Sequence, residues 1–272
     1  MRFIANHWPD SIGCQIMILF KYGGHAISNS EGVDPALEVL ARLIKAGERF
    51  VIVHGGGPAI NRELEAHGVK SEMVGGFRKT TPEVFEIVQR TLCGEVLRKL
   101  VNQLISLGIN AVGISAGDGD LTRAKIADPN LGLVGELVST NPKFLFDLLE
   151  SGFTPVISPI SITEQGIAVN MNADIVAGAL GGALCAKLVL FSTDVAGIYR
   201  NWPDTESLIE SICVDELVGI SKDFKDGMIP KAQSAINAIS AGAQTVRIFD
   251  GRQAQNIEAA ICGQIGTLVV PK

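Results

Sequence analysis

With 272 residues, the chain is long enough to bury a large core without a disulfide or a structural metal. Its 47% hydrophobic and 19% charged residues are the balance of a globular enzyme rather than of a disordered tail. Aromatic residues make up only 6% and the formal net charge is -6, which argues against a nucleic-acid-binding platform. Any anionic ligand must therefore be held by local groups.

Nothing in the sequence predicts export or membrane insertion. Residues 1–20 lack the basic start and cleavage signal of a secreted protein, and no apolar run approaches the length of a membrane span. The cysteines are scattered without a CxxC pair: Cys14, Cys93, Cys185, Cys213 and Cys262. We expect them to be reduced, mostly buried thiols of a cytoplasmic protein.

Short apolar runs alternate with stretches of helical period. We expect strands at Gln15–Phe20, Phe50–Val53, Asn110–Ile114, Thr154–Ser158, Lys187–Phe191, Gln244–Ile248 and Thr267–Val270. Apolar side chains share helix faces over residues 37–44, 84–88 and 96–104. The alternation predicts an α/β fold with an open, mainly parallel central sheet sandwiched between helices. No linker or repeat interrupts it, so we expect a single domain over residues 1–272.

Glycines follow the first three predicted strands, as Gly23-Gly24, as Gly55-Gly56-Gly57, and as Gly117 with Gly119. The carboxyl ends of parallel strands meet at one sheet edge, where glycine lets backbone N–H groups approach a phosphate. One such loop most often reflects turn geometry alone. Three loops, with Lys21 ending the first strand, predict an anion site.

Several nucleotide and hydrolase signatures can be excluded. The chain contains neither GxxxxGK[ST] nor a GxGxxG that opens a helix after a strand, and it lacks HRD and DFG motifs. Residues 113–117 match GxSxG, and residues 54–57 are similar to a lipase oxyanion loop. That fold requires a histidine after the serine, whereas all four histidines precede Ser115. A serine hydrolase is therefore excluded.

Five motifs occur in order: Lys21-Tyr22-Gly23-Gly24-His25, His54-Gly55-Gly56-Gly57-Pro58, Gly76-Phe77-Arg78, Asn170-Met171-Asn172-Ala173-Asp174 and Gly227-Met228-Ile229-Pro230-Lys231. Together they resemble the amino acid kinase family, and most closely its members that phosphorylate N-acetyl-L-glutamate. The resemblance implies transfer of phosphate from ATP to the γ-carboxylate, giving an acyl phosphate in arginine biosynthesis. It also implies an acyl-substrate lobe of about residues 15–180 and an ATP lobe of about residues 181–272.

The resemblance also implies residue roles. Lys21 and Lys231 would flank the transferred group, and Asp174 would hold both ammonium groups in position. Implied substrate-binding residues are Gly55, Gly56, Arg78, Asn170 and Asn172; implied ATP-binding residues are Gly23, Gly24, Asp194, Gly227 and Met228. Cations and N–H donors suit a reaction that spreads negative charge over phosphoryl oxygens, and an ionised carboxylate needs no general base. Mg²⁺ is implied by ATP, without a carboxylate cage of its own.

Other interpretations of these residues stay open. Taken alone, Asp174 also fits a helix N-cap, the two asparagines fit turn formers, and Arg78 fits a surface cation. Phe77 before Arg78 departs from the usual family step, so a kinase of carrier-protein-linked aminoadipate or glutamate remains an alternative. A non-catalytic amino-acid-binding regulator is a second one. The resemblance implies association through a central helix, which we expect over Glu83–Leu107, and so favours a homodimer or a higher homo-oligomer.

Overall fold

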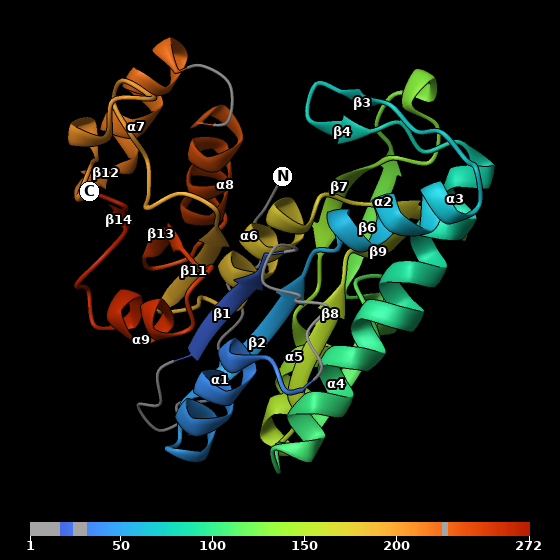
Figure 1. Cartoon of the computed structure of the whole chain (residues 1–272), viewed down its shortest axis with the longest axis horizontal. Helices are drawn as coiled ribbons and strands as arrows, with labels where there is room; N and C mark the ends of the chain where they lie inside the picture. Colours follow the sequence, from blue (N-terminus) through green and yellow to red (C-terminus); the bar gives the residue numbers. More distant parts are fainter. Residues whose placement is uncertain (1–16, 24–31, 225–227) are drawn as a thin grey trace.

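The computed structural model describes residues 17–23, 32–224 and 228–272, so the predicted site residues Gly24 and Gly227 lie outside the described residues. An eight-stranded sheet forms the centre of the molecule (Figure 1), in the order β12-β14-β13-β11-β1-β2-β8-β5. Its strands are β1 (Met17–Tyr22), β2 (Arg49–His54), β5 (Ala111–Ser115), β8 (Thr154–Ser158), β11 (Leu188–Thr193), β12 (Ser211–Cys213), β13 (Val246–Asp250) and β14 (Thr267–Val270).

The strands from β13 to β5 run parallel, and β14 is antiparallel to β13. Each predicted strand corresponds to one of these, and the predicted fold class is confirmed. The central strands are buried on both faces, because successive side chains enter opposite core clusters. In β1, for example, Leu19 belongs to one cluster while Ile18 and Phe20 belong to the other.

Helices cover both faces of the sheet. One face carries α1 (Pro35–Lys45), α4 (Leu97–Ser106) and α9 (Gln255–Ile261). The other carries α5 (Lys143–Glu150), α6 (Ala173–Ala183), α7 (Val214–Ile220) and α8 (Met228–Ser240). The predicted long helix over residues 83–107 is present as α3 (Pro82–Gln89) and α4, joined by the π-helical segment η1 (Arg90–Val96).

A smaller layer stands beside the main sheet. It consists of a four-stranded sheet in the order β10 (Ala168–Asn170), β9 (Ile160–Thr163), β6 (Thr122–Ile126) and β7 (Gly135–Thr140), the hairpin β3 (Met73–Val74) and β4 (Phe77–Arg78), and α2 (Gly57–Ala66). Short 3₁₀ turns lie at Asp118–Asp120, Pro129–Leu131, Thr205–Ser207 and Ser221–Asp223. These elements place the hairpin and α2 above the carboxyl ends of β1, β2 and β8 (Figure 1).

Helix α6 consists mainly of small and apolar residues, and residues 176–182 are buried. At Gly182 a Cβ would lie 2.5 Å from the backbone carbon of Ala241, so α6 packs directly on the chain that follows α8. The Asn172 side chain caps the helix by accepting hydrogen bonds from the Asp174 and Ile175 N–H groups. This packing fixes the first turn of α6 at the carboxyl edge of the sheet. The expected boundary between two lobes, at residues 180 and 181, falls inside α6.

The described cysteines are free, but the expectation of mostly buried thiols is wrong. Cys185 and Cys262 are exposed, and Cys93 and Cys213 are half-buried. Cys185 lies in the turn after α6 and Cys262 caps α9, so both stand at helix ends rather than in the core. Over the described ranges, no helix is long and apolar enough to cross a membrane.

Candidate active site

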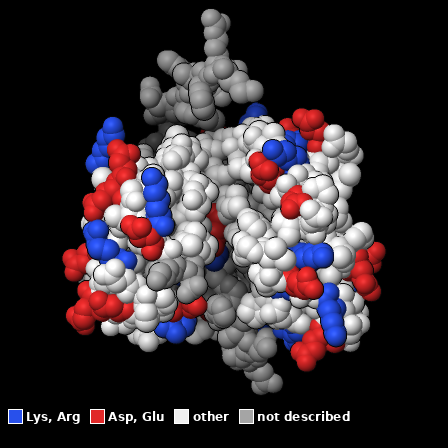
Figure 2. All heavy atoms as spheres, turned by 90° about the horizontal axis from the view of Figure 1, so that it is seen from above, with Lys and Arg blue, Asp and Glu red and all other residues white. Residues whose placement is uncertain are grey.

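Two cavities open at the carboxyl edge of the sheet. The larger, of about 320 Å³, is lined mainly by Lys21 of β1, by residues that follow β2, β8 and β10, by the hairpin β3–β4 and by the start of α6. The smaller, of about 140 Å³, is lined by residues following β1, β11 and β13 and by the start of α8. Seen from above, the molecule is hollowed between its two sides, and acidic and basic atoms lie at the floor (Figure 2). Lys21 and Asp174 line both cavities.

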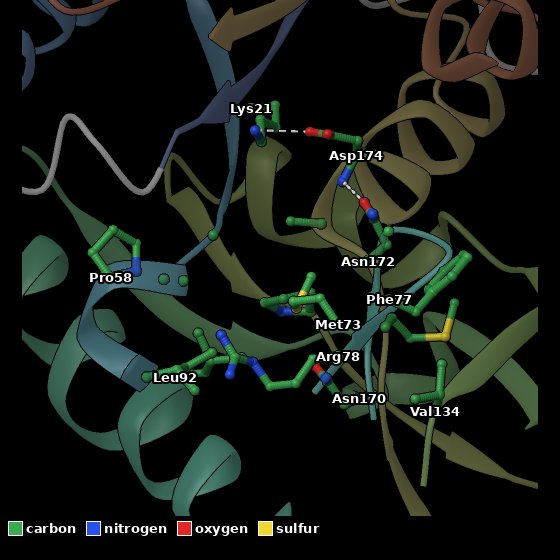
Figure 3. A pocket seen from close by; sticks show the side chains of 18 residues that line it. Lys21, Pro58, Met73, Phe77, Arg78, Leu92, Val134, Asn170, Asn172 and Asp174 are labelled. Carbon is green, nitrogen blue, oxygen red and sulfur yellow. Dashed lines mark hydrogen bonds and ion pairs between the residues drawn. The ribbon is translucent and has the colours of Figure 1, made fainter. Parts of the chain in front are cut away.

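Lys21 and Asp174 form an ion pair at this junction. The Lys21 Nζ atom lies 2.8 Å from Asp174 Oδ1, with the side chains 13% and 31% exposed. Lys21 comes from the end of β1 and Asp174 from the first turn of α6 (Figure 3). Because Asn172 is the N-cap, the alternative interpretation of Asp174 as a helix cap is wrong. The short distance between the two oppositely charged groups fixes the direction of the Lys21 ammonium.

The loop Gly55-Gly56-Gly57 forms the wall of the larger cavity beside Lys21. Gly56 occupies the N-cap position of α2 and has no side chain to bond the amides of the first turn. A Cβ at Gly56 would lie 2.6 Å from Leu92 Cδ2, so a larger residue here would force the Leu92 side chain of η1 to move. The wall therefore presents backbone N–H groups at a helix N-terminus, an arrangement that binds anions.

Arg78 and Asn170 lie at the opposite end of this cavity from Lys21 (Figure 3). The Arg78 guanidinium donates a hydrogen bond to Asn61 Oδ1 of α2, and partial burial lowers the pKa of the guanidinium. Thr80 Oγ1 donates to the Arg78 carbonyl at 2.6 Å and accepts from Asn170 Nδ2 at 3.3 Å. Thr80 itself is fully buried and thus joins the two cavity-lining residues from behind.

The smaller cavity carries a second lysine and an arginine. Lys231, in the first turn of α8, lies with Nζ 3.4 Å from Asp194 Oδ1. Arg252 follows β13 and donates hydrogen bonds to both Asp250 carboxylate oxygens, which lowers the pKa of Asp250. Two lysines and an arginine near a helix N-terminus suit a polyphosphate.

The sequence profile of the amino acid kinase family matches residues 17–250. The chain belongs to the amino acid kinase family. A curated relative, the acetylglutamate kinase of Corynebacterium glutamicum, is 39% identical over 275 aligned residues, covering 98% of this chain and 92% of the relative.

Solved structures of similar fold agree with this membership. The crystal structure of smu.665 from Streptococcus mutans has a TM-score of 0.78 and 26% identity, covering 94% of this chain and 99% of that one. Carbamate kinase from Giardia lamblia, solved bound to AMP-PNP, has a TM-score of 0.69 and 17% identity. The match covers 95% of this chain and 99% of the carbamate kinase chain. At this identity the similarity shows a shared fold alone.

Most of the predicted site residues that are described line one cavity or the other. The larger holds Gly55, Gly56, Arg78, Asn170 and Asn172; the smaller holds Gly23, Asp194 and Lys231; and Lys21 and Asp174 line both. Met228 is 2% exposed and its side chain packs in the core, so only its backbone is available for ATP. Asp174 was expected to hold both Lys21 and Lys231 in position. The structure shows its ion pair with Lys21 and an ion pair of Lys231 with Asp194, so a role of Asp174 toward Lys231 stays a prediction.

Sequence reasoning missed Arg252, Asn61 and Thr80. Arg252 had a readable signal, because Asp250-Gly251-Arg252 directly follows a predicted strand, as Lys21 and the glycine loops do. Asn61 and Thr80 had none, since they act through contacts with Arg78 and Asn170 that only the folded chain creates.

Proposed function

We propose that this chain is an acetylglutamate kinase, which uses ATP to phosphorylate the γ-carboxylate of N-acetyl-L-glutamate in arginine biosynthesis. One observation supports the proposal most strongly. The Lys21–Asp174 ion pair stands where two cavities meet, and the larger cavity holds a second cation, Arg78, at its far end. A dicarboxylate held in that cavity would place one carboxylate at each cation.

The far end suits the carboxylate that does not react. A guanidinium binds a carboxylate through two parallel hydrogen bonds and fixes its orientation. Asn61 holds the Arg78 guanidinium from α2, which limits the positions it can take. The Asn170 side chain donates to Thr80 through Nδ2, so its Oδ1 is left as an acceptor for the acetamido N–H of the substrate. With this end fixed, the γ-carboxylate would lie near Lys21.

Transfer then requires no proton movement on the acceptor. A γ-carboxylate oxygen attacks the γ-phosphorus of ATP, the bond from that phosphorus to the β–γ bridging oxygen breaks, and ADP leaves with the electron pair. Negative charge spreads over the phosphoryl oxygens in the transition state. Lys21 and the Gly56 N–H would stabilise it from the acceptor side, and Lys231 from the nucleotide side. Asp174 keeps the Lys21 ammonium directed at the junction.

The smaller cavity fits the phosphates of ATP. Lys231 and Arg252 supply positive charge, and the amino end of α8 faces the same space. Mg²⁺ is proposed to enter with ATP, bound mainly by phosphate oxygens and water. The division into an acyl-substrate lobe and an ATP lobe is proposed on the same grounds. A homodimer through the helix formed by α3, η1 and α4 is also proposed.

An acyl-phosphate assay tests the proposed substrate. The enzyme, ATP and Mg²⁺ are incubated with hydroxylamine, which traps an acyl phosphate as a coloured hydroxamate, and ADP is measured in parallel. Acceptors are N-acetyl-L-glutamate, L-glutamate and L-2-aminoadipate, free or attached to a carrier protein. We expect product and ADP in equal amounts with N-acetyl-L-glutamate alone. A preference for the carrier-linked acceptors would replace the proposal, and no turnover with any acceptor would support a non-catalytic regulator.

A further inference from the structure

His54 is a buried histidine next to the glycine loop. It ends β2, its side chain is fully buried, and it precedes Gly55 and Gly56 of the cavity wall. Its Nδ1 atom lies 2.8 Å from the carbonyl oxygen of Gly55, and its Nε2 atom is buried without a hydrogen-bond partner among the described residues. Since the ring does not line either cavity, His54 cannot touch the substrate.

The contact fixes the direction of one peptide group. The Gly55 carbonyl and the Gly56 N–H belong to the same planar trans peptide, so they point in opposite directions. With the carbonyl held against the buried ring, the Gly56 N–H points away from the ring. It has no acceptor within the described part of the chain, whereas the Gly55 N–H is already bonded to the Tyr22 carbonyl at 3.0 Å.

We propose that His54 is a positioning residue that locks the Gly55–Gly56 peptide and thereby aims the Gly56 N–H at the transferred phosphoryl group. The proposal rests on the proposed function for the identity of that group. Glycines at positions 55 to 57 leave the loop free to rotate its peptides, and a preorganised donor stabilises a transition state only if it cannot turn away. The ring supplies the restraint that the glycines lack.

The protonation state of the ring suits this role. Because Nδ1 faces a carbonyl oxygen, Nδ1 must carry the proton and donate. Burial lowers the pKa of His54 to about 4, so the ring is neutral near pH 7. The lock therefore adds no charge beside the anion site.

A matched pair of variants tests the lock. His54→Asn and His54→Leu both delete the ring and have nearly the same shape, but only asparagine carries a donor where Nδ1 stood. We expect His54→Leu to lower kcat for N-acetyl-L-glutamate at least tenfold relative to His54→Asn, with similar KM values and similar urea midpoints. Equal kcat in the two variants would overturn the proposal.

A measurement on the unmodified protein covers the case in which neither variant folds. Long-range ¹H–¹⁵N correlation spectra report which imidazole nitrogen carries the proton. We expect His54 to show the Nδ1–H tautomer at pH 7, and an Nε2–H tautomer would overturn the lock whatever the variants do. Wild-type turnover with N-acetyl-L-glutamate is recorded first. Its absence would reject the proposed function, while the tautomer still decides whether the lock exists.

Discussion

Lys21 Nζ and Asp174 Oδ1 lie 2.8 Å apart at the point where the two cavities meet. The contact joins the end of β1 to the first turn of α6, so it depends on the packing of that helix against the sheet. Asp174→Asn retains the shape of the side chain but removes the charge that orients Lys21. We expect kcat to fall at least tenfold while the urea midpoint changes little, since Asn172 still caps the helix. Unchanged kcat in a folded variant would remove Asp174 from the mechanism.

Lys231 should act mainly in the transition state. Replacing it with alanine removes positive charge from the smaller cavity, and we expect kcat to fall by roughly two to three orders of magnitude, far more than KM for ATP rises. The control is Lys143→Ala, because Lys143 is also ion-paired, with Asp147, but lines neither cavity. Steady-state kinetics on both variants make the comparison. Equal kinetics in the two variants would contradict the role of Lys231.

Arg78 is the proposed anchor for the non-reacting carboxylate. Lysine keeps the charge but cannot form two parallel hydrogen bonds, so Arg78→Lys should raise KM for N-acetyl-L-glutamate about tenfold or more. Such a rise corresponds to the ~1.5–3 kcal/mol of a hydrogen bond to a charged group. KM for ATP should stay the same. The α-amide of N-acetylglutamate serves as a second acceptor, and its efficient use by the wild type would exclude Arg78 as the carboxylate anchor.

Thr80 offers a test of how the far end of the cavity is held. Thr80→Val removes the hydroxyl that joins Arg78 to Asn170, whereas Thr80→Ser keeps it. We expect the valine variant to raise KM for N-acetyl-L-glutamate about three- to tenfold, and the serine variant to restore it, because a lost neutral hydrogen bond costs ~0.5–1.5 kcal/mol. Should both variants raise KM equally, the side-chain packing of Thr80 would matter rather than its hydroxyl.

His54 makes stability depend on pH. The unfolded chain takes up a proton at the ordinary imidazole pKa of 6.5, whereas the folded chain does so only near pH 4. Between these values the unfolded state binds more protons, so stability should fall as the pH decreases from about 6.5 to about 4, by ~3 kcal/mol in all. Tyr22, the register partner of His54, donates a hydrogen bond from its hydroxyl to the buried Asp34. Substitution of His54 leaves both of these residues unchanged.

Urea unfolding of wild type and His54→Asn over pH 4 to 8 measures this effect. The variant should lose less stability than the wild type between pH 6.5 and 4, and the two curves should run parallel above pH 6.5. Parallel curves over the whole range would show that His54 does not hold a lowered pKa.

Most strands of the main sheet could be predicted because they are buried on both faces and therefore read as apolar runs. The edge strand β12 was missed, since it is only three residues long. The smaller sheet could not be predicted. In β6, for example, Arg123 and Lys125 alternate with apolar residues, and no long apolar run marks it. The π-helical segment was also missed, since the apolar spacing around it fits an ordinary helix. In the folded chain η1 contacts Gly56 through Leu92 and strand β8 through the Cys93–Ser158 hydrogen bond, and neither contact can be read from the sequence.

The candidate site divides in the same way. Lys21, Gly55 and Gly56 are readable because strand ends and glycines mark the carboxyl edge of a parallel sheet. Asn61 contacts Arg78, and Thr80 contacts Asn170, and both partners are distant in sequence. No local sequence pattern therefore distinguishes Asn61 and Thr80 from other polar residues. The His54 contact depends on burial of the ring, which the strand alternation alone does not specify.

The most direct test of the central claim is hydroxamate formation from N-acetyl-L-glutamate and ATP by the wild type and by Lys21→Ala, measured side by side. The claim is that phosphate passes to a carboxylate at the Lys21–Asp174 junction. It predicts rapid, stoichiometric formation of hydroxamate and ADP by the wild type, and a rate roughly two to three orders of magnitude lower in the folded variant. Equal rates in the two proteins, or ADP release without hydroxamate in the wild type, would contradict it.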